Sequence, residues 1–411
     1  MNRRVLNKVP EVTIYFWIIK ILCTTVGESA ADFLNVNLNF GLTATSVVTG
    51  VILAVVLTVQ MSLGRYVAGV YWLTVALVSV FGTLITDNLV DNLGVTLETC
   101  TIVFSVLLGL VFLAWYLSEK TLSIHSIYTR RREAWYWLTI FVTFALGTAT
   151  GDLVSTGLGL GYLYTGLLCA GLIAAITIGW RLGLNSILAF WLAYILTRPL
   201  GASVGDLMAK PSNEGGLNLG TTVTSLILLG LIVAIIIYLS VRKPDVIPVP
   251  TDPAGLAALD ELETAPDHRP ESARTALIQT VVVLVLTVVL GVASYVWRVN
   301  ALNAEAAAPV QGDSATAGTA ASPLGDMSIF ITITQDTLDK VSAGQQSEAT
   351  ARITDLESEW DKAAATLKRR NPDAWTAVDK KIDTVLRQLR STSPNATDEI
   401  AALQDLLKQI G

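Results

Sequence analysis

Nine long apolar stretches restrict what this chain can fold into more than any other feature of its sequence. Each approaches the ~20 residues that an α-helix needs to cross a bilayer. Helices are expected because hydrocarbon offers the backbone no hydrogen-bond partners. A mean hydropathy of +0.56 with 15% charged residues also lies outside the range typical of soluble domains. The predicted spans are residues 12–33, 43–63, 69–91, 98–117, 134–156, 159–180, 184–209, 221–241 and 276–298.

Lysine and arginine positions predict how these spans are oriented. One set of connections is rich in basic residues, whereas the opposite set carries only Lys210. By the positive-inside rule, the basic side is cytoplasmic. We therefore expect a protein of the bacterial inner membrane, with a cytoplasmic N-terminus and a C-terminal domain on the outer side. The basic connections hold Arg3, Arg4 and Lys8; Arg65; Lys120 and Arg130 to Arg132; Arg181; and Arg242 and Lys243.

Charge divides the chain into an apolar part and an acidic part. Residues 1–243 hold 14 Lys and Arg against 11 Asp and Glu, whereas residues 244–411 hold 14 against 23. Helical periodicity returns after the last span, with predicted helices starting at Asp373 and near Asn395. The predicted parts are a transmembrane core at 1–243, with repeats at about 8–64, 65–120, 130–181 and 182–243; a cytoplasmic linker at 244–275; the ninth span at 276–298; a flexible tether at 299–326; and an extracytoplasmic helical domain at 327–411.

An internal repeat organises the first eight spans. Four six-residue segments align without gaps, and each ends in an acidic residue preceded by small residues at the first, fourth and fifth positions before it. Two spans separate successive acids, so all four copies enter the membrane in the same direction. The fold class predicted is an all-α membrane protein of four tandem parallel two-helix repeats around a pseudo-fourfold axis, with a ninth span and a small outer helical domain. The aligned segments are residues 23–28, 82–87, 147–152 and 201–206.

Several of these segments resemble a bacterial family of uncharacterised membrane-anchored proteins. The similarity rests on Leu146–Leu153, Arg198–Leu207, the opening Lys8–Thr13 and the following Trp17–Lys20. It covers about residues 8–243. The resemblance implies four tandem two-helix repeats, and it brings no established substrate.

The recurrent acids are the candidate functional residues. A charge at mid-bilayer costs about 2.5–3.5 kcal/mol on insertion scales, so such residues normally face a bundle interior or a wet cavity. We expect an ion-binding path formed by Glu28, Asp32, Asp87, Asp91, Asp152 and Asp206. Lys20, Arg198 and Lys210 are expected to act as counter-charges or as a gate. A metal ion would be held by Glu28, Asp87, Asp152 and Asp206.

Residue chemistry favours a small hard cation as the ligand. Oxygen ligands without His or Cys suit a divalent metal such as Mn²⁺ or Mg²⁺, or protons shared between crowded carboxylates. His125 and His268 both lie outside the apolar spans. The leading prediction is a transporter or permease for such a cation, in the lipid bilayer. Coupling of this transport to protons is part of the hypothesis. We expect no enzymatic activity, no cofactor and no nucleic-acid partner; the oligomeric state stays open.

A second hypothesis needs no transport. Acids and bases of neighbouring copies would pair to lock the register of a membrane anchor or sensor. Acids near the surface favour this alternative, since they can reach water at little cost.

Overall fold

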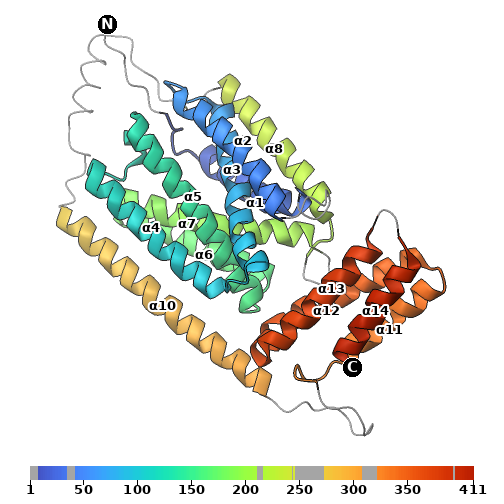
Figure 1. The fold of residues 1–411 in the computed structure, drawn as a ribbon. Helices are drawn as coiled ribbons and strands as arrows, with labels where there is room; N and C mark the ends of the chain where they lie inside the picture. Colours follow the sequence, from blue (N-terminus) through green and yellow to red (C-terminus); the bar gives the residue numbers. More distant parts are fainter. Residues whose placement is uncertain are drawn as a thin grey trace, which may run out of the picture. The chain divides into compact units, whose positions relative to one another are not determined.

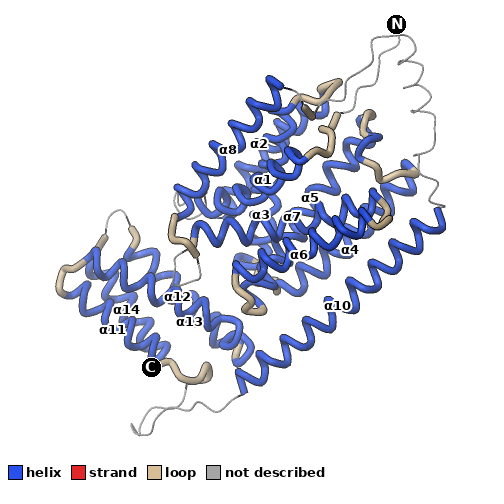
Figure 2. Tube along the Cα trace, turned by 180° about the vertical axis from the view of Figure 1, so that it is seen from behind, coloured by secondary structure: helices blue, strands red, loops and turns tan. Residues whose placement is uncertain are grey.

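The computed structural model describes residues 8–34, 42–210, 216–242, 244–245, 273–307, 322–391 and 394–411. The described residues form helices and connecting loops (Figure 2). They separate into two compact units, and the boundary between the units falls within α10 (Ala273–Ala307). Most of the predicted linker, residues 246–272, lies outside the described residues. At its C-terminal end α10 continues past residue 299, where the sequence predicted the start of the tether.

Eight long helices build the first unit (Figure 1). Together with α10 they make nine described helices that are long and apolar enough to cross a membrane, as the sequence predicted. The chain is a multi-pass membrane protein. The eight helices are α1 (Ile14–Asp32), α2 (Leu42–Ser62), α3 (Ala68–Asp87), α4 (Leu97–Glu119), α5 (Arg130–Asp152), α6 (Tyr162–Arg181), α7 (Ser186–Ala209) and α8 (Gly220–Arg242).

The first helices of the four repeats form a closed inner ring. Helix α1 contacts α3 and α7, and α5 also contacts α3 and α7. Between 56% and 72% of the residues in these four spans are buried, against 11% to 28% in α2, α4, α6 and α8. The outer four therefore present most of their apolar surface to lipid.

Each outer helix packs mainly on the inner helix of the next repeat. Helix α2 lies on α3, α4 on α5 and α6 on α7, and α8 of the last repeat lies on α1 of the first. No repeat thus completes its own packing, because its second helix covers its neighbour. This cyclic exchange ties the four copies into one body.

Local sequence signals explain where the inner helices begin. The Thr13 hydroxyl accepts a hydrogen bond from the Phe16 amide, and the Thr129 hydroxyl accepts one from the Arg132 amide. The Asn185 side-chain oxygen accepts from two amides at the start of α7. Such caps satisfy amides that the first helical turn leaves without partners.

The inner helices of the second and third repeats continue past the repeat acid into π-helical turns. Helix α3 continues into the π-helical segment η2 (Asn88–Asn92), and α5 continues into η4 (Leu153–Gly157). Left-handed Gly94 and Gly159, with φ of 67° and 65°, then end the helical path. In both repeats a tight turn thus follows the π-helical segment.

The second unit contains a four-helix bundle. Its helices are α11 (Ser328–Ser342), α12 (Gln346–Arg370), α13 (Pro372–Leu389) and α14 (Ala396–Ile410). The last two agree with the helices predicted from Asp373 and Asn395. Each helix contacts the next along the chain, and α14 returns to α11. The bundle has its own apolar core, in which Trp360 stacks on Trp375.

Candidate functional site

The four repeat acids lie at the C-terminal ends of the inner helices, which we call the acid end of the ring. Glu28 and Asp206 are buried, each with 7% of its surface exposed, whereas Asp87 and Asp152 are partly buried. Asp87 and Asp152 are the last residues of α3 and α5, directly before the two π-helical segments. Negative charge near a helix C-terminus opposes the helix dipole, so stability does not favour these acids here.

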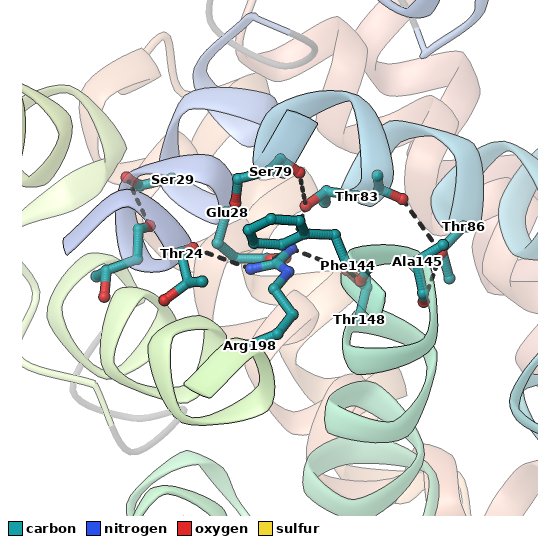
Figure 3. Close-up of polar contacts among 12 residues, drawn as sticks. Thr24, Glu28, Ser29, Ser79, Thr83, Thr86, Phe144, Ala145, Thr148 and Arg198 are labelled. Carbon is teal, nitrogen blue, oxygen red and sulfur yellow. Dashed lines mark hydrogen bonds and ion pairs between the residues drawn. The ribbon is translucent and has the colours of Figure 1, made fainter. Parts of the chain in front are cut away.

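Arg198 extends from α7 into the centre of the ring and is fully buried (Figure 3). Its Nη2 lies 2.7 Å from Glu28 Oε2 and forms an ion pair. Its Nη1 donates to the Thr24 carbonyl oxygen at 2.9 Å. Both of these partners belong to α1.

The same guanidinium also reaches the two remaining repeats. The two N–H groups of Nη2 are shared between Glu28 and the hydroxyls of Thr83 on α3 and Thr148 on α5, the latter at 2.8 Å. Thr24, Thr83 and Thr148 occupy the same repeat position, four residues before the acid. One side chain therefore holds matched positions of three repeats, which requires the four inner helices to lie in register.

Lys20 is the second cation buried at this centre, at the same repeat position as Arg198. Its ammonium lies 4.0 Å from the ring centre of Phe144 and 4.1 Å from that of Tyr194. It is 1% exposed, and Nζ has no hydrogen-bond partner among the described residues. Aromatic faces thus supply the stabilising contacts seen for this charge.

An aromatic layer fills the ring beyond Lys20, toward the N-terminal ends of the inner helices. The Tyr71 and Tyr136 hydroxyls lie 2.5 Å apart, and Trp137 packs against Tyr71. Phe16 and Tyr194 lie between this layer and Lys20, with ring centres 6.5 Å apart. In this conformation the interior is closed by rings.

Glycines allow the inner helices to approach closely enough for these contacts. A Cβ on Gly82 would lie 2.8 Å from Phe144 Cβ, and one on Gly147 would lie 3.2 Å from Pro199 Cδ. Gly201 faces Thr24 in the same way. The small residues of the repeat are therefore contact surfaces between inner helices.

The structure corrects the prediction of a metal site. Among the described residues, no three His, Cys, Asp or Glu side chains gather closely enough to hold a metal ion, so Glu28, Asp87, Asp152 and Asp206 do not form a ligand set. The physical reason is that Arg198 occupies the centre and takes Glu28 as its partner.

The other predicted site residues are distributed unevenly. Asp91 is exposed in η2, and the side chain of Asp32 lies outside the described residues. Lys210 follows α7, where its amide donates to the Asp206 carbonyl oxygen at 2.8 Å. Of the predicted residues, the described structure brings together Lys20, Glu28 and Arg198 at the centre.

Sequence reasoning missed two sets of residues. The threonines that bind Arg198 were treated only as small residues, although a hydroxyl recurs at that position in three copies. Lys8 was given no role in the protein interior, yet it forms a buried ion pair with Glu133 of α5. Glu133 directly follows Arg130 to Arg132, and such a run of charges is typical of a solvent-exposed surface rather than of a buried residue.

Comparison with known families agrees with the repeat. A family model described as a Repeat of Unknown Function (DUF347) matches four times, at residues 15–66, 70–121, 135–182 and 189–244. The chain belongs to this family. The four DUF347 copies coincide with the four inner–outer helix pairs, so the predicted four-repeat architecture is confirmed. No curated protein and no solved structure matches the chain.

Proposed function

We propose that this protein transports a small hard cation, Mn²⁺, Mg²⁺ or a proton, through the ring of inner helices. We further infer a pseudo-fourfold axis through the ring, from its cyclic packing. From the Lys and Arg pattern, we place the acid end and the C-terminal unit on the outer side of a bacterial inner membrane.

The observation that carries the proposal is the Glu28–Arg198 pair. Burying two charges costs several kcal/mol per ion in solvation, and apolar residues of similar size often stabilise a core as well or better. A buried pair therefore suits a function in which one partner is exchanged. Glu28 can exchange Arg198 for an arriving cation.

The surrounding charges favour such an exchange. Asp206 is buried on the helix that carries Arg198, and Asp87 and Asp152 end the two other inner helices. Several carboxylates at one end attract cations and raise their local concentration. Lys20, at the level of Arg198, repels a cation until the network rearranges, so the two cations act as a gate.

A structural lock is the competing function, and one observation favours it. Arg198 bonds to α1, α3 and α5 at once, which would hold four repeats in register without any transport. This alternative matches a membrane anchor or sensor. Transport measurements on matched variants separate the two.

The test uses purified protein in liposomes, with fluorescent reporters for Mn²⁺, Mg²⁺ and protons inside the vesicles. We expect flux of at least one of these ions in the wild type and at least a tenfold loss in Glu28→Gln. Glu98→Gln, at the start of α4, is the control and should keep wild-type flux. Transport is refuted if none of the three ions moves, or if Glu28→Gln moves it as fast as the wild type.

A further inference from the structure

A short non-helical segment packs against the end of the inner ring opposite the acid end. Residues 8–13 precede α1, and Lys8, Val9 and Pro10 are buried. The Lys8 amide donates to the Ile127 carbonyl oxygen at 3.0 Å. Val9 belongs to the apolar core that contains Tyr71, Tyr136 and Trp137.

The segment is held by a buried ion pair. Lys8 Nζ lies 2.6 Å from Glu133 Oε2, with side-chain exposures of 6% and 0%. Gln60 Nε2 donates to the other carboxylate oxygen of Glu133 at 3.1 Å, and Lys8 Nζ also donates to the Met61 carbonyl oxygen at 3.1 Å. The cluster joins the segment to the end of α2 and the first turn of α5.

The start of the linker adds a second attachment. The Glu11 amide donates to the Asp245 carbonyl oxygen at 3.0 Å. Tyr66, between α2 and α3, donates its hydroxyl to Asp245 Oδ2 at 2.6 Å. Burial, followed by this bond to a carboxylate, raises the pKa of the Tyr66 hydroxyl above its ordinary value, so it stays a donor.

The position of Glu133 sets this ion pair apart from the Arg198 network. Glu133 precedes Thr148 on α5 by roughly 22 Å, at a rise of about 1.5 Å per residue. The aromatic layer lies between them. The Lys8–Glu133 pair and the Arg198 network therefore contact α5 near its opposite ends.

We propose that residues 8–13 are an amino-terminal plug, latched by Lys8–Glu133, that must release before an ion can pass this end of the ring. The proposal rests on the transport function proposed above. Residues 8–13 form no helix of their own, so few local bonds oppose their release. A buried ion pair suits a latch, because losing either partner leaves a buried charge and drives the segment out.

The test measures plug opening directly, without requiring transport. Val9→Cys places a thiol of similar size inside the plug, in a background where Cys23, Cys100 and Cys169 are replaced by Ser. A water-soluble maleimide should label this introduced thiol slowly in the parent and at least ten times faster after Glu133→Gln or Lys8→Met. Lys8→Arg, which keeps the charge, should stay protected.

Glu119→Gln is the matched control. It breaks the neighbouring ion pairs of Glu119 with Arg131 and Arg132 but keeps both partners of the Lys8–Glu133 pair, so the introduced thiol should stay protected. Equal labelling in the parent and in Glu133→Gln overturns the plug, as does fast labelling in the Glu119→Gln control. Ion flux, measured in the same variants with Val9 retained, separates the two proposals. If labelling of the thiol accelerates while no ion moves, the segment opens but the transport proposal fails. If ions move while labelling does not change, the transport proposal holds but the plug fails.

Discussion

Arg198 links all four repeats, so replacing this single residue tests how much the central network contributes to stability. Arg198→Met leaves Glu28 buried without its cation, which we expect to cost about 3–5 kcal/mol. Adding Glu28→Gln removes the unpaired charge and should recover at least about 1 kcal/mol relative to the sum of the single changes. Unfolding of the four proteins in detergent measures this coupling. Additive effects would show that the pair contributes nothing specific.

Arg198→Lys addresses geometry rather than charge. A lysine ammonium is a single point of charge and cannot reach the Thr24 carbonyl, Glu28 and the two threonine hydroxyls together. We expect the melting temperature to fall by several degrees although the charge is kept. A wild-type melting temperature in this variant would show that the threonine contacts are unimportant.

At the residue scale, the sequence predicted the participants better than their arrangement. The cost of charge in hydrocarbon correctly identified Glu28, Lys20 and Arg198 as interior residues. It did not predict that the larger, planar guanidinium would occupy the centre, because that depends on which of four side chains at one level reaches furthest. Phe144 and Ser79 share the level with Lys20 and Arg198, and nothing in the spacing distinguished their roles.

Close approach of the inner helices is a property of whole elements and depends on glycine. At Gly82, an added Cβ would lie 3.3 Å from the Ala145 backbone nitrogen, which cannot move as a side chain can. Gly82→Ala should therefore push α3 from α5 and lower the melting temperature by several degrees. Gly109→Ala, on α4 with no heavy atom within 4 Å, is the control and should be neutral or slightly stabilising. Equal effects of the two changes would contradict tight packing between α3 and α5.

Helix existence was predictable at the element scale, whereas helix endings were not. Runs of about 20 apolar residues specify spans with little ambiguity, and all nine were found. The π-helical turns after Asp87 and Asp152 left no signal, because they arise from how the last turn is held rather than from composition. Such turns are frequent at functional sites, and here they directly follow two of the repeat acids.

The cyclic packing of outer helices makes a prediction for the whole first unit. Fragments 1–125 and 126–411 each lack a partner helix, because α4 lies on α5 and α8 lies on α1. We expect the two fragments to copurify when they are expressed together and to be degraded or aggregate when expressed alone. A stable, monodisperse 1–125 fragment would contradict the exchange between repeats.

The second unit should fold without the first, since it has a separate apolar core. Partial burial raises the pKa of Asp379 above 3.8, although Trp360 Nε1 donates to its carboxylate at 2.9 Å. The folded state then binds the proton more tightly than the unfolded state, so this contribution to stability is lost as pH rises through the raised pKa. Asp379→Asn should raise the melting temperature of residues 322–411 at pH 7.5 by a few degrees, corresponding to less than about 1 kcal/mol. Circular dichroism at pH 4 and 7.5 measures this, and a larger gain at pH 4 would contradict it.

Because α8 packs on α1, the first helix to be synthesised gains its outer partner only after the last helix of the bundle has been made. When α1 enters the bilayer, Lys20 meets lipid or translocon rather than Phe144 and Tyr194, and its partner helices α5 and α7 have not yet been made. The nascent chain must therefore carry α1 with the Lys20 side chain exposed until the fourth hairpin arrives. During membrane insertion the first three hairpins therefore form an incomplete ring. The ring closes only when α7 and α8 pack against α1.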